Sequence, residues 1–406
     1  MKIKHLAIIL LSLAGASCSN NEDFGEHHSI NEFLSEGESR AAWKSSGFDS
    51  KFFIEACRQS EGNIVVSPVS AKIMLTMFSN AVSEETEKEI ARVIGYDDKA
   101  SLNSLCTKYL TNLPLLDNQI SLAFANSFWY KESRQIHPDF APTAEMYFGE
   151  SVFPHAFSPV GQLLDDMNKW VASNTLNMIP AMFSEDDLSE AANYVLLNAL
   201  SFSGKWQDKF DKKETKDGVF HGKSGDRKVK MMHQKIVHPE LHYTDHTTSV
   251  VLFLGNGSFE VAFVLPDEGV DIDELIESGE IVSYKDNWAS AQLDLTLPRF
   301  SYSADDNTGL VDILAGMGCE SLRTPDAVKI LDGKTNNQAI CLLQKCAVEF
   351  DEDGAKAVAS SGGSDGLTAA ITPGSTHKMV FDRPFVFFIS ERSTDAIILA
   401  GKIVDL

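Results

Sequence analysis

Residues 348–363 (VEFDEDGAKAVASSGG) combine the pattern of a β-strand with side chains that are too small to fix the segment in a core. The first four residues alternate between apolar and polar, as a half-buried strand does. After Gly354, which allows a free bend, one parity carries only Ala355, Ala357, Ala359, Ser361 and Gly363. Because successive side chains of an extended chain point to opposite faces, one face would be uniformly small. The pattern predicts a strand that can enter and leave a sheet; the alternative is an Ala/Gly/Ser loop between two strands.

The whole chain has 406 residues and a formal net charge of −23. This length suits either one large domain or two smaller ones. An acidic surface repels nucleic acid and anionic membranes, and we identify no basic cluster that offsets the charge. We therefore expect no nucleic-acid partner.

Cysteine and histidine give no sign of a metal site. Five of the six cysteines lie beyond Cys18, an odd number that leaves at least one thiol free, and no CxxC motif suggests zinc. His238, His242 and His246 recur every four residues, but Pro239 interrupts a segment that is not clearly helical. We predict a solvated loop there, and we expect neither a metal nor a cofactor.

The N-terminus has the pattern of a targeting segment. Lys2 and Lys4 precede the apolar run Leu6–Leu13 and the small residues 14–17, after which comes Cys18. This order resembles a bacterial lipoprotein signal, in which the cysteine becomes the first residue and carries the lipid; the alternative is a plain secretory signal. We predict a signal peptide over 1–17, a flexible acidic tether over 18–46 and a folded domain over 47–406. The resemblance implies an outer-membrane lipoprotein that faces the periplasm or the cell surface, a soluble form in the extracellular space, and membrane contact only through Cys18.

Local patterns mark helices and strands along the chain, without the regular strand–helix alternation of a parallel sheet. Ser67 followed by Pro68 predicts the start of a helix. Thr86–Glu89 has the spacing of a capping box. Val195–Phe202 is a nearly continuous apolar strand that is interrupted by Asn198, a residue that needs hydrogen-bond partners if it is buried. Together these patterns favour the α+β class.

Four blocks of sequence, in order and at the expected separations, resemble the serpin family. They are 63–70 (NIVVSPVS), 198–210 (NALSFSGKWQDKF), 352–359 (EDGAKAVA) and 382–405, which includes RPFVFFI at 383–389. The resemblance covers about 47–406. With the lipoprotein-type signal, it is that of a bacterial serine protease inhibitor.

The resemblance implies an α+β fold of three β-sheets and about nine helices, with an exposed reactive-centre loop at about 353–378. It also implies that a target serine protease attacks this loop and forms a covalent acyl complex. The cleaved loop then inserts into the main sheet as a new strand and carries the protease to the far end of the molecule. Such a chain is a monomeric suicide-substrate inhibitor, and it has no catalytic residues of its own.

Site roles follow from the same resemblance. The hinge would comprise Glu352, Gly354, Ala355, Ala357 and Ala359. The regions where the main sheet opens, known as the breach and the shutter, would comprise Ser67, Ser70, Asn198, Trp206 and Gln344. The family usually has a histidine at the position of Gln344, so the pH sensitivity of a histidine would be absent here.

The bond offered to the protease depends on how the loop is counted. Counting from Glu352 places it at Thr368–Ala369, whereas counting back from Pro384 makes the loop about five residues longer than usual. Leu367 and Ile371 are therefore alternatives. Small or aliphatic residues suit elastase-like or subtilisin-like proteases, Leu367 suits a chymotrypsin-like one, and papain-like cysteine proteases are a further class. None of the candidate bait residues is Arg or Lys, which disfavours trypsin-like targets.

Two other classes of function compete with this interpretation. A hydrolase is disfavoured because the sequence has no Gly-x-Ser-x-Gly motif, and residues 363–366 (GSDG) lack the strand-to-helix context of a nucleophile elbow. A non-inhibitory serpin that acts as a binding or carrier module is the second alternative. Bulky or charged hinge residues would favour that module, whereas Ala355, Ala357 and Ala359 favour an inhibitor.

Overall fold

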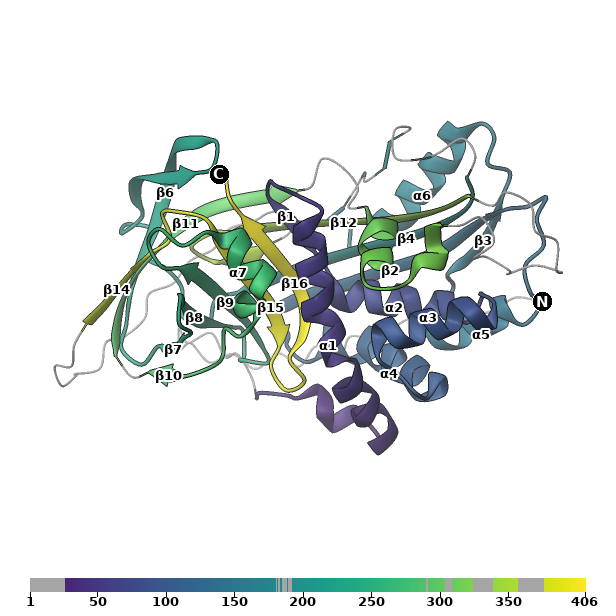
Figure 1. Ribbon diagram of the computed structural model, residues 1–406, viewed down its shortest axis with the longest axis horizontal. Helices are drawn as coiled ribbons and strands as arrows, with labels where there is room; N and C mark the ends of the chain where they lie inside the picture. The colour runs from purple at the N-terminus through teal and green to yellow at the C-terminus, as the bar shows by residue number, and fades with distance from the viewer. Residues whose placement is uncertain are drawn as a thin grey trace, which may run out of the picture.

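The computed structural model describes residues 26–179, 181, 183–184, 188, 192–289, 291–303, 309–323, 339–356 and 376–406. Among them are eight α-helices, where about nine helices were expected: α1 Glu36–Arg58, α2 Pro68–Ser79, α3 Glu84–Ile94, α4 Lys99–Asn112, α5 Phe140–Phe148, α6 Val160–Asn174, α7 Ile272–Ser278 and α8 Leu310–Gly316 (Figure 1). No helix in this part of the chain is long and apolar enough to cross a membrane.

The strands form the three sheets that were predicted. The central sheet runs β3 (Val152–His155), β2 (Ile120–Lys131), β4 (Ala192–Lys205), β12 (Ala339–Phe350) and the C-terminal end of β11 (Gln292–Ser303), with the short β13 (Gly354–Lys356) between β4 and β12. The N-terminal part of β11 belongs to an edge sheet with β14 (Thr376–Val380), β6 (Gly225–Ile236) and β5 (Lys216–Gly222). The third sheet has the order β1 (Ile64–Val66), β16 (Ala396–Ile403), β15 (Phe385–Glu391), β9 (Phe259–Pro266), β8 (Thr247–Leu254), β7 (Glu240–Tyr243) and β10 (Trp288–Ala289).

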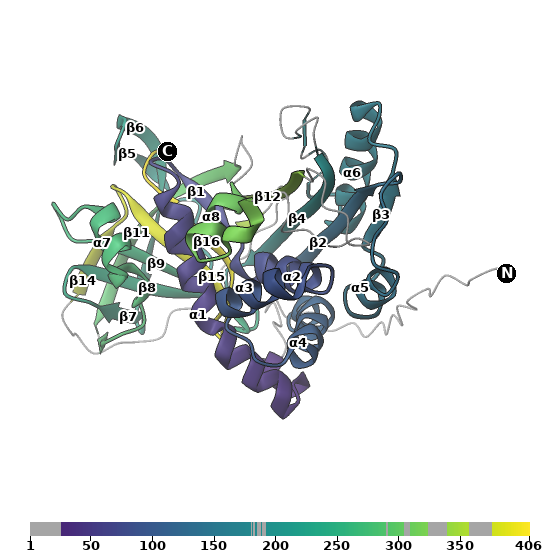
Figure 2. The same ribbon diagram turned by 45° about the vertical axis from the view of Figure 1, so that its right-hand side comes forward.

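Both faces of the central sheet are covered, which explains the nearly continuous apolar sequence of β4. Val195, Leu197 and Ala199 face one side and pack with Met167 and Val171 of α6 in one buried cluster. The alternate residues of β4 point to the other side, into the main core beneath α2, where Asn198 contacts Ser70. Figure 2 shows α6 and α2 on the two sides of β4 and β2.

Helix starts follow local capping chemistry, with one difference from the prediction. Ser67 caps α2 and Pro68 is its first residue, as expected. The cap of α3 is Ser83, whose hydroxyl accepts a hydrogen bond from Thr86 N (3.4 Å), so the predicted start at Thr86 is wrong by one turn. The first turn after Ser83 is acidic, with Glu84, Glu85 and Glu87. These negative side chains complement the positive N-terminal end of the helix dipole.

The flexible tether predicted over 18–46 is wrong from Ile30 onward. A 3₁₀ turn spans Ile30–Phe33 and α1 begins at Glu36, because Ser29 with Glu32 and Ser35 with Glu38 form two capping boxes. The acidic residues that suggested a solvated tether therefore act as helix-start signals.

The segment 26–33, here called the N-terminal strap, is tied to two distant hairpin turns. Ser258 Oγ in the β8–β9 turn donates to His28 O (2.7 Å), and Asn31 Nδ2 donates to Ser393 O in the β15–β16 turn (3.0 Å). Ile30 is fully buried and its N–H points to Glu391 Oε1 at 3.5 Å. The strap thus packs as part of the folded body.

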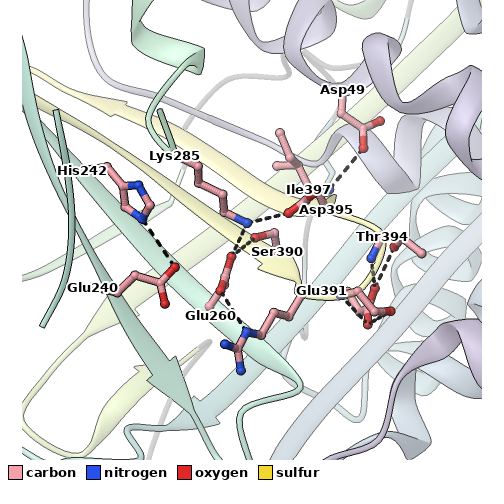
Figure 3. Close-up of polar contacts among 12 residues, drawn as sticks. Asp49, Glu240, His242, Glu260, Lys285, Ser390, Glu391, Thr394, Asp395 and Ile397 are labelled. Carbon is pink, nitrogen blue, oxygen red and sulfur yellow. Dashed lines mark hydrogen bonds and ion pairs between the residues drawn. The ribbon is translucent and has the colours of Figure 1, made fainter. Parts of the chain in front are cut away.

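Buried charges hold the β15–β16 turn onto which the strap packs (Figure 3). Glu391 is fully buried and accepts hydrogen bonds from Thr394 N (3.0 Å) and Oγ1 (2.7 Å). Glu260, on the adjacent strand β9, is 1% exposed and pairs with Lys285 (2.6 Å). Burial raises the pKa of the Glu260 carboxyl, although the Lys285 ammonium favours its charged form. These carboxylates are satisfied in place, as buried charges must be.

Candidate functional site

The short strand β13 is wedged between two long strands of the central sheet. Ala355 is paired with Phe350 of β12 on one side and with Gly204 of β4 on the other. Its side chain is 0% exposed. At Gly354 an added Cβ would collide with the carbonyl oxygen of Gly204, so only glycine fits this position. We call this arrangement the fork; it places the first residues of the predicted loop inside the sheet.

Beyond the fork, β4 and β12 pair directly with each other. The two strands run parallel, with partners from Leu200↔Cys346 to Ala192↔Ala339. Any further strand between them must therefore separate these pairs. Burial raises the pKa of the Cys346 thiol far above its usual range, so this side chain stays a neutral, apolar group in the junction.

A buried polar cluster lies at the middle of this junction. Asn198 Nδ2 donates to Ser70 O (2.9 Å) and Ser70 Oγ (2.6 Å) and also contacts Asn126 Oδ1. Gln344, opposite Asn198 on β12, donates from Nε2 to Ser67 O (3.1 Å) and to Asn198 Oδ1, and its Oε1 accepts from Ser67 N (3.1 Å). The cluster therefore joins β2, β4 and β12 to the start of α2 through groups that cannot reach water.

Trp206 fixes the turn that precedes the fork. The indole is 1% exposed and stacks on Phe350 with ring centroids 5.9 Å apart. Its Nε1 donates to Asp351 O (2.8 Å), and its backbone N–H donates to Asp353 O (3.0 Å). The turn 351–353 is thus held at both ends by one residue of β4's C-terminal extension.

Side chains from the segment after Trp206 add charge contacts to the same turn. Thr215 Oγ1 donates to Glu352 Oε1 (2.8 Å), and Arg299 lies 3.8 Å from the other carboxylate oxygen. Lys212 Nζ donates to Asp353 Oδ2 (2.7 Å), and this hydrogen bond raises the pKa of Lys212. Residues 212–215 therefore lie beside the start of the predicted loop.

The structure brings most of the predicted site residues into these two places. Glu352, Gly354 and Ala355 lie at the fork with Trp206, and the other four lie in the buried cluster: Ser67, Ser70, Asn198 and Gln344. The remaining predicted residues lie outside the described part of the chain: Cys18, Ala357, Ala359, Leu367, Thr368, Ala369 and Ile371.

Asn126 was missed from the sequence. It interrupts the apolar run Phe124–Tyr130 in the same way that Asn198 interrupts its own strand, and the two residues are direct partners in the β2–β4 pairing. A search for isolated asparagines in apolar strands would have identified both.

The three histidines do not converge. His242 lies in β7 and is only 8% exposed, so the predicted solvated loop is wrong for this residue, because the strand carries it inward. His246 Nδ1 contacts Glu280 (2.9 Å), and this hydrogen bond raises the pKa of His246. Within the described ranges, no three His, Cys, Asp or Glu side chains are grouped so that they could hold a metal.

Comparisons with known proteins agree with this arrangement. The family model "Serpin (serine protease inhibitor)" matches residues 45–406. Antichymotrypsin-2 of Bombyx mori is 27% identical over 354 residues, which cover 84% of this chain and 92% of that protein. Human neuroserpin is 24% identical over 370 residues, covering 84% and 86%.

Solved structures share the fold at lower identity. The thermophilic serpin tengpin in its native state superposes with a TM-score of 0.80 at 24% identity, covering 92% of this chain and 95% of tengpin. Human thyroxine-binding globulin superposes with a TM-score of 0.75 at 22% identity, covering 90% and 99%. These likenesses support the same three-sheet architecture.

Proposed function

The chain belongs to the serpin family, whose members are generally protease inhibitors, and on that premise we propose that it is a suicide-substrate inhibitor of serine proteases. The observation that carries the proposal is the fork. A small, fully buried Ala355 is already paired on both sides, in the direction that the rest of the loop would follow.

In the proposed reaction, the serine hydroxyl of the protease attacks the carbonyl carbon of the bait residue. An ester to the enzyme forms, and the peptide bond breaks to release the new amine. We place this bond at Thr368–Ala369, with Leu367 and Ile371 as alternative bait residues. The chain that follows Gly354 then enters between β4 and β12. About fourteen residues at about 3.3 Å each would carry the protease about 45 Å before water hydrolyses the ester.

The alternative function is a non-inhibitory binding or carrier module. One structural relative, human thyroxine-binding globulin, was solved as a complex with thyroxine, so the same fold can bind a small molecule. A charged or bulky residue in the fork would favour that alternative. Ala355 and the close approach of Gly354 to Gly204 favour the inhibitor.

Mixing the protein with an elastase-like or subtilisin-like protease tests the proposal. We expect an SDS-resistant complex of the two chains, and mass spectrometry of the released C-terminal peptide will identify the cleaved bond. Protease blocked at its active serine is the control and should give no complex. Cleavage of the loop without a complex would favour the carrier module, and turnover of a generic substrate would favour an enzyme.

We also propose that the chain is exported and carries lipid on Cys18 at the outer membrane. The support is the order of basic, apolar and small residues before that cysteine. Cells fed labelled palmitate should incorporate the label into the wild-type chain and not into a Cys18→Ser variant. Equal labelling of both chains would contradict the anchor.

A further inference from the structure

One segment of this acidic protein is basic. Residues 205–235 contain ten Lys and Arg against five Asp and Glu, a net charge of +5, so the rest of the chain carries −28. The expectation that no basic cluster offsets the negative charge is therefore wrong. The excess of cations is visible only when charge is counted over one window and not over the whole chain.

The basic segment adjoins both ends of the predicted loop. It contains β5 and β6, and β6 pairs with β11, which in turn pairs with β14, the first described strand after the loop. On the other side, Lys212 and Thr215 bind Asp353 and Glu352, which immediately precede the fork. Figure 1 shows β6 and β14 at the same end of the molecule.

Several cations at this end have no carboxylate of their own. Two acidic residues here are already engaged: Asp217 pairs with Lys230 (2.7 Å) and Glu214 with Lys216 (3.2 Å). In contrast, five exposed cations form no ion pair within the described part of the chain: Lys213, Arg227, Lys228, Lys235 and Lys378. This end of the molecule, which carries the five cations on both sides of β6, is here called the basic face and can attract an anionic partner.

A groove of about 490 Å³ lies beside one of these five cations, Lys378. Its walls include Val219 and Met231 from the β5–β6 hairpin, His233, and Lys378 from β14. The carboxylates that line it are paired, as Asp382 is with Arg383 (3.4 Å), whereas Lys378 is not. The groove thus places the unpaired ammonium of Lys378 beside apolar surface, near the C-terminal end of the predicted loop.

We propose that the basic face docks the acidic surface of the protease that attacks the loop. This inference rests on the proposed function, and it names the kind of target: a protease with a negatively charged rim around its active site. Because the rest of the inhibitor carries a net charge of −28, an orientation that presents the basic face to an acidic protease is favoured over the others. Steering of this kind raises association rates by about 10- to 1,000-fold and weakens as salt screens the charges.

One protease in two chemical forms tests the docking. Acetylation of subtilisin lysines removes positive charge, whereas succinylation replaces it with negative charge. With both forms titrated for active sites, we expect the inhibitor to associate about tenfold faster with the succinylated form at low salt, and the advantage to disappear in high salt. The Lys228→Glu/Lys235→Glu variant, here called the β6 variant, should lose that advantage.

A matched variant controls for net charge. Arg40 and Lys51 are exposed on α1, away from β6 in Figure 1, and neither forms an ion pair among the described residues. The Arg40→Glu/Lys51→Glu variant changes the net charge by the same amount and should keep the preference for the succinylated protease. Equal rates for the wild type and both variants would overturn the docking face and leave the inhibitor function intact.

A binding measurement separates docking from inhibition. Succinylated subtilisin blocked at its active serine should bind the wild type more tightly than the β6 variant in surface plasmon resonance, whether or not a covalent complex forms. Failure to form a covalent complex with active protease would count only against the inhibitor. If the β6 variant instead lost only its retention on dextran sulfate, the face would be a polyanion site and the proposal would be wrong.

Discussion

Replacing Ala355 with glutamate is expected to convert the inhibitor into a substrate, with at least a 100-fold lower yield of SDS-resistant complex and unchanged cleavage of the loop. Ala355 is fully buried in the fork, between Gly204 and Phe350. A carboxylate there must leave the sheet, because burying an unpaired charge costs several kcal/mol. Insertion would then start too late to precede hydrolysis of the acyl-enzyme. Densitometry of complex and cleaved bands at several ratios of inhibitor to protease measures the yield.

Gln207→Glu is the matched control for this substitution. Gln207 is exposed, and its backbone N–H donates to Phe253 O (2.9 Å) at the same end of the sheet, outside the path between β4 and β12. It adds the same charge and should leave the yield of complex within about twofold of the wild type, because an exposed charge is solvated. A normal yield from Ala355→Glu would show that the fork does not lie on the insertion path.

Asn198→Ala should loosen the intact protein and speed the separation of β4 from β12. The substitution removes the partner of Gln344 Nε2 and both hydrogen bonds to Ser70, in a place where water cannot replace them. Each buried group left without a partner costs about 1–3 kcal/mol, so we expect a loss of about 3 kcal/mol or more. The urea concentration at the first unfolding transition measures this loss, and the time course of spontaneous conversion to a protease-resistant form measures the separation.

Asn174→Ala provides the comparison for that experiment. Asn174 is exposed at the end of α6, and its side chain donates only to Trp170 O (2.8 Å) among the described residues. Removing the Asn174 side chain should change the urea concentration at the first unfolding transition little, because water can replace its hydrogen bond. If the two variants unfolded at the same urea concentration, the buried cluster would not hold the junction.

Local pattern was sufficient wherever a residue's role depends on its neighbours in sequence. The alternation in β4 and the lone Asn198 predicted a strand with an internal hydrogen-bond requirement, and Ser67 with Pro68 predicted the start of α2. The small residues after Gly354 predicted a segment that fits a sheet, and its first residues lie in one. These features are encoded within a few residues of each other.

Features that depend on distant contacts escaped the same reasoning. Ile30 is buried because the chain returns to it 361 residues later, at Glu391, and nothing near Ile30 in sequence indicates that contact. The strap therefore looked like a solvated tether. The basic character of 205–235 becomes meaningful only when pairing places β6 and β14 beside the same loop.

The position of β13 also affects the competition between insertion of the loop and hydrolysis of the acyl-enzyme. Insertion of a strand is slowest at its first residues, because ordering them forms few hydrogen bonds. Here Gly354 and Ala355 are already paired in the sheet before any protease binds. After cleavage, two processes begin at the same moment. One is insertion of the loop past the eight β4–β12 pairs from Cys346 to Ala339, and the other is attack of water on the ester. The ratio of these two rates fixes how many inhibitor molecules are consumed for each protease that is captured.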